Sequence, residues 1–268
     1  MKQISKIILA NCFQGQKRRG VGNVKKNLGN LLNDYDVSSS IPNEYFNNKR
    51  GYNELAEQVY QNHVNRHKTL TIGGDHSISI GSLQGSLRYY KQHLTTIWVD
   101  AHADLNTYAS SPSGNLHGMP LGFLTGLETN FIQEPYYKLD FNKLKYLGLR
   151  DLDEFERKTI FTKDIQHLTA EQLNKEISLD TISIGTRYIH LSLDVDVLDP
   201  EYMNSTGTKV DGGVSMEKLE EIINWVNKKG EIVSVDLVEY NPELTNDNKV
   251  KERDYNNFER IFGRIMDL

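Results

Sequence analysis

The sequence predicts an α/β protein, arranged as a three-layer α/β/α fold with a mostly parallel central sheet. Short apolar, β-branched runs alternate with longer segments of helical period along most of the chain, a pattern typical of a parallel sheet with helices on both faces. Clusters of charged residues directly follow these runs, as expected where ligands collect beyond the carboxyl ends of parallel strands. No linker interrupts the 268 residues, so we expect a single domain over residues 1–268.

Six segments are expected to be strands because they are short, apolar and rich in β-branched residues. They are residues 6–10, 69–72, 95–100, 144–148, 188–194 and 231–236. Helical periodicity predicts helices over residues 52–67, 215–229 and 256–266. Ser215 is the expected N-cap of the second helix, and Gly230 is its expected stop.

The composition excludes several classes of protein. With 31 Lys+Arg against 36 Asp+Glu, the formal charge of -5 gives no general electrostatic case for binding nucleic acid. We expect the one basic run, residues 16–26, to be a solvated face. Cys12 is the single cysteine, which excludes an intrachain disulfide and a multi-thiolate metal site and favours a reducing compartment. We find neither a signal-peptide core nor an apolar run of about 18 residues, so we expect a cytoplasmic protein with no membrane partner.

Carboxylates and histidines are concentrated directly after five of the expected strands. Because the carboxyl ends of parallel strands meet at one edge of a sheet, we expect these side chains to converge. They are His76 after the second strand, Asp100, His102 and Asp104 after the third, Asp151 and Asp153 after the fourth, Asp194 and Asp196 after the fifth, and Glu239 after the sixth. An extended Asp-x-His-x-Asp or Asp-x-Asp would project these residues to one side.

The residue types at this edge favour a site for two divalent metal ions. Four aspartates gathered in one pocket would repel each other unless cations lay between them. Together with two histidines they make six oxygen and nitrogen ligands without a thiolate, a set that suits Mn²⁺, or Mg²⁺, Co²⁺ or Fe²⁺, better than structural zinc. Taken singly, an Asp-x-Asp at a strand end is more often a turn or a helix cap, and His76 could be a hydrogen-bonded core histidine.

Five motifs, in order along the chain, resemble the signature of the ureohydrolases. They are GGDHS at 73–77, DAHAD at 100–104, SLDVDVLDP at 192–200, TGT at 206–208 and VEYNP at 238–242. Within that superfamily, NT at 106–107 and SGNLHGMP at 113–120 resemble arginase rather than agmatinase. The resemblance implies two Mn²⁺ ions per subunit, with Asp100 and Asp194 bridging. His76 and Asp104 would complete one site, and His102 and Asp196 the other. A hydroxide between the ions would convert L-arginine to L-ornithine and urea.

The same resemblance implies roles for the substrate-binding residues. Glu239 would bind the guanidinium group, His117 would act as proton shuttle, and Asp104 counts among the catalytic residues as well as the ligands. The α-carboxylate would be contacted by Asn106, Ser111 and Ser113, with Asn115 from the same loop, and the α-amino group by Asp153 with Glu156 behind it. Thr208 is grouped with these residues and is expected to support the metal ligands. Without the motifs, Glu239 would be read as a surface carboxylate, and His117, Asn106 and the serines as loop residues.

Some positions depart from the family pattern. Residues 16–27 resemble the family's Gly-rich entry loop, but residues 23–26 replace its usual acidic and Gly-Pro portion. Lys209 stands where proline is common, and Glu154-Phe155 replaces Pro-Gly beside the α-amino site. The crossover from 168 to 188 is short, and residues 177–185 are β-branched, so we expect a trimmed outer helix there. The pair His63 and His67 has the spacing of a helical metal site but no further ligands, so we expect it at the surface.

Two rival functions remain open at this stage. One is another ureohydrolase that acts on agmatine or a related guanidino compound. The other is a metal-dependent arginine or ornithine binding protein without turnover, although such a protein has little need of a proton shuttle. Arginase-like proteins are commonly trimers or hexamers, so the resemblance also implies a homo-oligomer.

Overall fold

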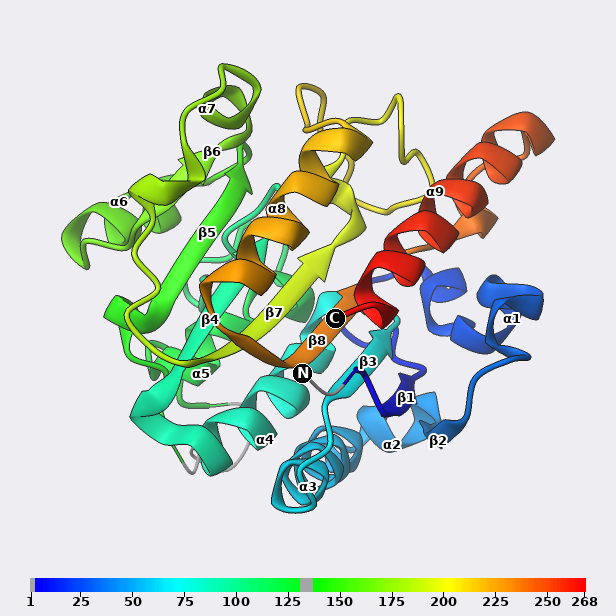
Figure 1. Ribbon diagram of the computed structural model, residues 1–268, viewed down its shortest axis with the longest axis horizontal. Coiled ribbons are helices and arrows are strands. Elements are labelled where there is room, and N and C mark those ends of the chain that lie inside the picture. Colours follow the sequence, from blue (N-terminus) through cyan, green and yellow to red (C-terminus); the bar gives the residue numbers. More distant parts are fainter. Residues whose placement is uncertain (1–2, 131–136) are drawn as a thin grey trace.

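The computed structural model describes residues 3–130 and 137–268. Within these ranges, eight strands form one parallel sheet in the order β2-β1-β3-β8-β7-β4-β5-β6 (Figure 1). The strands are β1 (Lys6–Ala10), β2 (Val37–Ile41), β3 (Thr69–Gly73), β4 (Leu94–Val99), β5 (Leu144–Leu149), β6 (His167–Thr169), β7 (Tyr188–Asp194) and β8 (Glu231–Val238). The expected α/β class with a parallel sheet is therefore confirmed.

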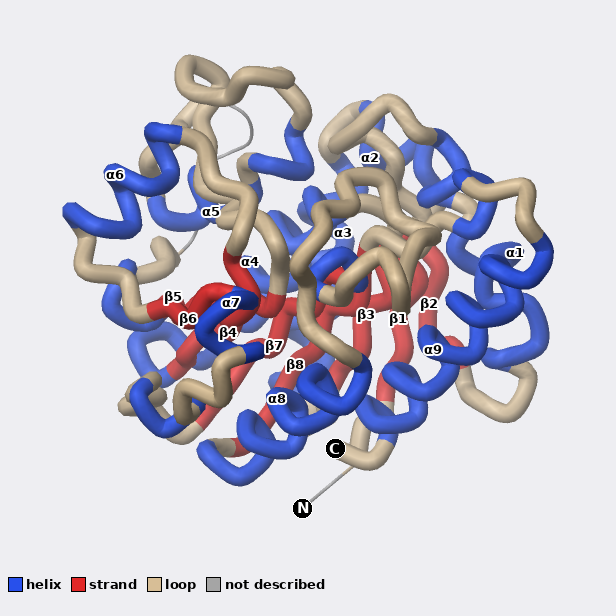
Figure 2. Tube along the Cα trace, turned by 90° about the horizontal axis from the view of Figure 1, so that it is seen from above, coloured by secondary structure: helices blue, strands red, loops and turns tan. Residues whose placement is uncertain are grey.

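Helices cover both faces of this sheet (Figure 2). One face packs against α1 (Val24–Leu28), α7 (Ala170–Asn174), α8 (Met216–Lys229) and α9 (Asn248–Met266), whose apolar residues join one core cluster. The other face packs against α2 (Asn43–Asn47), α3 (Arg50–Val64), α4 (Ser79–Tyr90), α5 (Pro120–Thr125) and α6 (Glu154–Thr162), through two further clusters. None of the described helices has the length and apolarity needed to cross a membrane.

All six expected strands form, with bounds that agree to within two residues. The two strands that the sequence did not predict, β2 and β6, lie at the two edges of the sheet. An edge strand has one neighbour and needs less apolar character, and β2 is VSSSI while β6 has three residues. Their patterns therefore lack the apolar run that identifies a central strand.

The cap predicted for the helix after Ser215 is confirmed, whereas the helix expected over residues 256–266 starts earlier than predicted. The Ser215 hydroxyl accepts a hydrogen bond from the Lys218 backbone N–H and caps α8 as expected. Helix α9 begins at Asn248, eight residues before the expected start, because the Asp247 carboxylate caps it. Its first two turns, residues 248–254, are mostly polar or charged, so the apolar period becomes visible only further along the helix.

The expectation that His63 lies at the surface is wrong. Its side chain is 1% exposed, and Nε2 lies 3.1 Å from the Ser86 hydroxyl on α4. Burial lowers the pKa of His63 to about 3, and His190 nearby adds to the shift. Because α3 packs along α4, the inner face of α3 is buried, whereas His67 lies beyond the helix end and is half-buried. The two histidines therefore form no common site.

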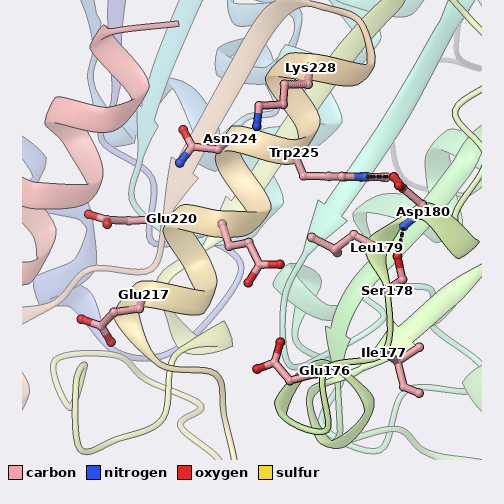
Figure 3. A pocket seen from close by; sticks show the side chains of 11 residues that line it. Glu176, Ile177, Ser178, Leu179, Asp180, Glu217, Glu220, Asn224, Trp225 and Lys228 are labelled. Carbon is pink, nitrogen blue, oxygen red and sulfur yellow. Dashed lines mark hydrogen bonds between the residues drawn. The ribbon is translucent and has the colours of Figure 1, made fainter.

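The short crossover before β7 folds as expected, with the five-residue α7 followed by a 3₁₀ turn at Leu179–Thr181. A cavity of about 510 Å³ lies between this segment and α8 (Figure 3). Acidic side chains line it, but Asp180 pairs with Lys229 and accepts a hydrogen bond from Trp225, while Glu220 pairs with Arg260. These charges already have partners, so the cavity supplies no separate functional site.

Candidate active site

The predicted metal ligands and Glu239 follow four strands that are direct neighbours at the centre of the sheet, β3-β8-β7-β4, whereas Asp153 and Glu156 follow β5. One row of the register runs through Ile72, Leu237, Leu193 and Val99. The chain leaves this row at the same edge on every strand and leads to His76, Glu239, Asp194 and Asp100, respectively. All four of these side chains are at most 2% exposed. The register thus brings residues up to 163 positions apart in sequence into one pocket.

The first group of possible metal ligands surrounds Nδ1 of His76. This nitrogen lies 3.0, 3.1 and 3.4 Å from the Oδ2 atoms of Asp100, Asp104 and Asp194, respectively. It is buried and makes no aligned hydrogen bond with the described residues. On the other side of the ring, Nε2 lies 2.8 Å from the Ser192 hydroxyl. The ring can donate from Nε2 to Ser192, and Nδ1 then presents its lone pair to the carboxylates, as a metal ligand would.

The second group lies around Nδ1 of His102, which is 3.4 Å from Oδ1 of Asp100 and 3.1 Å from Oδ2 of Asp196. Its three ligand atoms lie within 4.8 Å of one another, as do those of His76, Asp100 and Asp104 in the first group. Asp100 belongs to both groups and offers a different oxygen to each histidine. Three features fit a pair of hard divalent cations. Nδ1 of His76 is buried without an aligned hydrogen bond, the Asp100 carboxylate is shared between the groups, and all donor atoms are oxygen or nitrogen.

The aspartates converge through turns and not through the extended backbone that the spacing suggested. Oδ1 of Asp100 accepts from the His102 backbone N–H at 2.7 Å, and Oδ1 of Asp194 accepts from that of Asp196 at 2.8 Å. The second turn opens the 3₁₀ helix Val195–Val197. Asp194 thus caps its turn with Oδ1 and faces His76 with Oδ2, whereas Oδ1 of Asp100 both caps its turn and lies near Nδ1 of His102. A turn and convergence on the pocket therefore occur together in these Asp-x-Asp and Asp-x-His segments.

Backbone strain is present at two positions of the site. Asp104 has φ of 50° and Glu239 has φ of 69°, a region that residues with a side chain rarely adopt. Such conformations persist only where the surrounding structure enforces them, and they are concentrated at functional sites. The strain accompanies two side chains that both turn into the pocket.

The pocket concentrates negative charge. Burial raises the pKa of Asp104 to about 6, and the nearby charge of Asp100 adds to this shift. Burial also raises the pKa of Asp194 well above its ordinary value, again with help from neighbouring carboxylates. Burial alone would lower the pKa of His76, but the three surrounding aspartates raise it. A bound cation would relieve this repulsion and keep the carboxylates ionised.

Three further side chains contact the ligand candidates from the side away from the pocket. The Trp98 indole stacks on the His76 ring with centroids 4.0 Å apart, and its Nε1 donates to Oδ2 of Asp100 at 3.0 Å. The Thr208 hydroxyl donates to Oδ2 of Asp196 at 3.0 Å, the supporting position expected for it. Sequence reasoning missed Trp98 and Ser192, although they lie two residues before the ligand candidates Asp100 and Asp194, a spacing that places side chains of an extended segment on one face.

Glu239 lies beside the first group and accepts three hydrogen bonds. Oε1 accepts from the His76 backbone N–H at 2.9 Å and from Nδ1 of His117 at 3.0 Å, and Oε2 accepts from Nε2 of Gln16 at 2.5 Å. Burial alone would lower the pKa of His117, but the Glu239 carboxylate raises it to about 9. The pair is thus an imidazolium held by a buried carboxylate at neutral pH.

Gln16, unlike the exposed basic side chains of residues 17–26, is turned inward, which corrects the expectation of a solvated face at this position.

The residues expected at the amino-acid end of the substrate form two sets. Asp153 caps α6 in a reciprocal capping box with Glu156, and its Oδ2 accepts from the Asn106 side chain at 2.6 Å. Burial raises the pKa of Glu156 to about 8. The cap does not use the side chains of Glu154 or Phe155, so the departure from Pro-Gly leaves it intact.

The second set lies on the turn before His117. The hydroxyls of Ser111 and Ser113 accept from the backbone N–H groups of Gly114 and Asn115, at 3.1 and 3.2 Å. These hydroxyls therefore stabilise the turn itself. Ser110, which the sequence did not single out, donates to Oδ1 of Asn106 at 2.7 Å and links the turn to the first set.

Comparison with known proteins identifies relatives along most of the chain. A family model described as the arginase family matches residues 15–253. The arginase of Neurospora crassa is 42% identical over 213 residues, which cover 73% of this chain and 59% of that protein. The arginase of Emericella nidulans is 42% identical over 208 residues, which cover 71% of this chain and 64% of that protein. The chain thus spans about three fifths of the length of these curated relatives.

Solved structures match over nearly the whole chain. The arginase of Bacillus cereus superposes with a TM-score of 0.87 at 30% identity, covering 99% of this chain and 98% of that one. The arginase of Entamoeba histolytica, solved in complex with L-ornithine, superposes with a TM-score of 0.83 at 28% identity, covering 98% of this chain and 100% of that one. The family match, the shared fold and the converging His and Asp residues agree: the chain belongs to the arginase family.

Proposed function

We propose that this protein is an arginase, which hydrolyses L-arginine to L-ornithine and urea with two Mn²⁺ ions. The observation that carries the proposal is the carboxylate of Asp100, which is shared between two groups of possible ligands, His76 with Asp104 and His102 with Asp196. Relatives named arginase and the L-ornithine complex of the Entamoeba histolytica protein support the choice of substrate.

In this proposal, His76, Asp100, Asp104 and Asp194 hold one ion, and His102, Asp100, Asp194 and Asp196 hold the other. The oxygen and nitrogen donor set favours Mn²⁺ over metals that prefer thiolates. Two divalent ions in such a position lower the pKa of a water molecule and supply a hydroxide nucleophile near neutral pH. Trp98, Ser192 and Thr208 keep the ligands in place through the contacts described above.

The protein supplies the charge that orients the guanidinium group. Glu239 is buried and carries a carboxylate at the edge of the ligand groups, and a permanently cationic guanidinium is best held by a carboxylate. The imidazolium of His117 can donate a proton to the leaving amine. Because Nδ1 is engaged by Glu239, Nε2 is the atom available for this transfer.

The amino-acid end of the substrate meets the loops after β4 and β5. Asp153, with Glu156 behind it, is proposed to bind the α-amino group, and Asn106, Ser111, Ser113 and Asn115 the α-carboxylate. A substrate that lacks either group would leave its partner in the protein unpaired, which is how such a site discriminates. Self-association into a trimer or hexamer and a cytoplasmic location belong to the same proposal, by resemblance to the family.

Urea release tests the proposal. Protein loaded with Mn²⁺ is incubated in turn with L-arginine, agmatine and 4-guanidinobutyrate, and we expect urea from L-arginine at a kcat/KM well above that for the other two. Faster turnover of agmatine would replace arginase with an agmatine-directed ureohydrolase. Urea from none of the three, with metal bound, would leave a binding protein without turnover.

A further inference from the structure

We propose that Gln16 is the positioning residue for the guanidinium-binding carboxylate, Glu239. Its neutral side-chain amide fixes Oε2 of Glu239 and determines where on that carboxylate the substrate can bind. The inference rests on the proposed function in one respect, namely that Glu239 receives a guanidinium group. It adds a residue from the loop before α1, a segment outside the motifs that indicated the site.

The loop that carries Gln16 is fastened on both sides of the residue. The Gly15 backbone N–H donates to Oδ2 of Asp75 at 2.7 Å, and the Gly15 carbonyl accepts from the His117 backbone N–H at 3.1 Å. A Cβ at position 15 would clash with the Asp75 carboxylate and lie 2.9 Å from Cβ of His117. Only glycine therefore allows the loop to approach closely enough for Gln16 to reach the pocket, where it is 9% exposed.

The loop formed by residues 206–208 also restricts the side chain of Gln16. A Cβ on Gly207 would lie 3.0 Å from Oε1 of Gln16 and 2.8 Å from Nη1 of Arg18. The next residue, Thr208, donates to the ligand candidate Asp196. Gln16 thus lies between Glu239 and the loop that supports the second ligand group, which leaves its amide little freedom to rotate away.

A count of lone pairs shows what this contact does. A carboxylate offers about four acceptor positions, two on each oxygen. Oε1 already accepts from the His76 backbone and from His117, and Oε2 accepts from Gln16. One position remains, on Oε2, and its direction is set by the Gln16 amide. The guanidinium group therefore meets Glu239 through Oε2, beside Gln16.

The chemical type of the residue matters as much as its place. A lysine or arginine could hold Oε2 equally well, but together with the His117 imidazolium at Oε1 it would place two positive charges on one carboxylate and so repel a cationic substrate. An amide donates a hydrogen bond without adding charge. Gln16 thus orients Glu239 without adding a second positive charge to the one that His117 already places at Oε1.

The test compares three variants with the wild-type protein, all loaded with Mn²⁺. Gln16→Met keeps the size and removes the donor, and Gln16→Lys keeps a donor and adds charge. Gln14→Met is the matched control, because Gln14 lies on the same loop but donates to Asn43. We expect kcat/KM for L-arginine to fall about 10- to 100-fold in Gln16→Met, the effect of losing a hydrogen bond to a charged group. Gln16→Lys should raise KM for L-arginine by at least the same factor. In Gln14→Met, kcat/KM should stay within twofold of the wild-type value, and the amount of bound manganese should be unchanged in all three variants.

A readout without turnover separates this inference from the proposed function. In the substrate-free protein, amide hydrogen exchange of residues 13–22 should become at least 10-fold faster in Gln16→Met and stay unchanged in Gln14→Met. An active Gln16→Met variant with wild-type kinetics, or unchanged exchange in this segment, would overturn the role of Gln16. If the wild-type protein releases no urea, the proposed function fails, and the exchange data alone decide whether Gln16 fastens the loop to Glu239.

Discussion

The indole N–H of Trp98 donates to Oδ2 of Asp100 at 3.0 Å, the same oxygen that lies 3.0 Å from Nδ1 of His76. Trp98 is completely buried in β4 and also stacks on the His76 ring. Trp98 therefore fixes the position of the Asp100 carboxylate, which is shared between the two groups of ligand candidates, and also the ring plane of His76. This contact links the packing of the central sheet to the geometry of the candidate metal site.

Replacement of Trp98 by phenylalanine separates the two contributions. Trp98→Phe keeps an aromatic ring against His76 and removes the donor to Asp100, so we expect Mn²⁺ affinity to fall about 10-fold, as is typical when a partner of a metal ligand is lost. Trp225→Phe makes the same chemical change at a surface contact with Asp180 and is the control. Titration of the metal-free proteins with Mn²⁺ measures both. Equal affinities in the two variants would show that the indole N–H does not support the ligand.

Asp100 should be more important for metal content than Asp104. Asp100 belongs to both ligand groups, whereas Asp104 belongs to the first alone. We expect Asp100→Asn to lose most of both ions after desalting, and Asp104→Asn to keep about one ion per chain. Elemental analysis of manganese against protein concentration gives the two stoichiometries. Unchanged manganese in Asp100→Asn would refute the shared-ligand assignment.

The sequence predicts the central part of this molecule because burial on both faces makes parallel strands into apolar runs. The ligand residues directly follow these runs, so fold and ligand candidates could be found together. The turn geometry could not be found in this way. Whether Asp194 and Asp196 are extended or turned depends on a local competition between the carboxylate and the backbone N–H groups, which spacing does not reveal.

Contacts made by residues outside the recognised motifs could also not be predicted from the sequence. Gln16 contacts Glu239 across 223 positions, and nothing in a basic, polar run indicates that its first residue turns inward. His63 was misplaced for a related reason, because the packing of α3 on α4 decides which face of the helix is buried. Both errors concern tertiary contacts, and in the second case the partner helix, α4, was itself not among the helices predicted from the sequence.

The ion pair of His117 with Glu239 predicts a defined dependence of stability on pH. The pKa of His117 is about 9 in the folded metal-free protein, against an ordinary value of 6.5. A raised pKa stabilises the folded state fully below pH 6.5, and this contribution is lost as the pH rises through 9. Because one pKa unit corresponds to about 1.4 kcal/mol, the loss is on the order of 3 kcal/mol.

Urea unfolding in the presence of a chelator measures this contribution at pH 6, 7.5 and 9.5. The difference in free energy of unfolding between wild-type protein and His117→Asn should shrink as the pH rises. His93→Asn, at an exposed histidine, is the control and should follow the wild-type curve. A constant difference between wild-type and His117→Asn over this range would mean that the ion pair with Glu239 does not stabilise the fold.

Asp153 combines a structural and a proposed substrate role, and two variants separate them. Its Oδ1 accepts from the Glu156 backbone N–H and caps α6, a role that asparagine also fills. We expect the free energy of unfolding of Asp153→Asn to lie within about 1 kcal/mol of the wild-type value, and that of Asp153→Ala to be about 1 kcal/mol lower than that of Asp153→Asn. Both should reduce kcat/KM for L-arginine about 10- to 100-fold, because each removes the charge proposed to bind the α-amino group. Turnover of 4-guanidinobutyrate, which has no α-amino group, should change less than threefold in Asp153→Asn. An equal loss on both substrates would contradict the α-amino assignment and leave Asp153 as a helix cap alone.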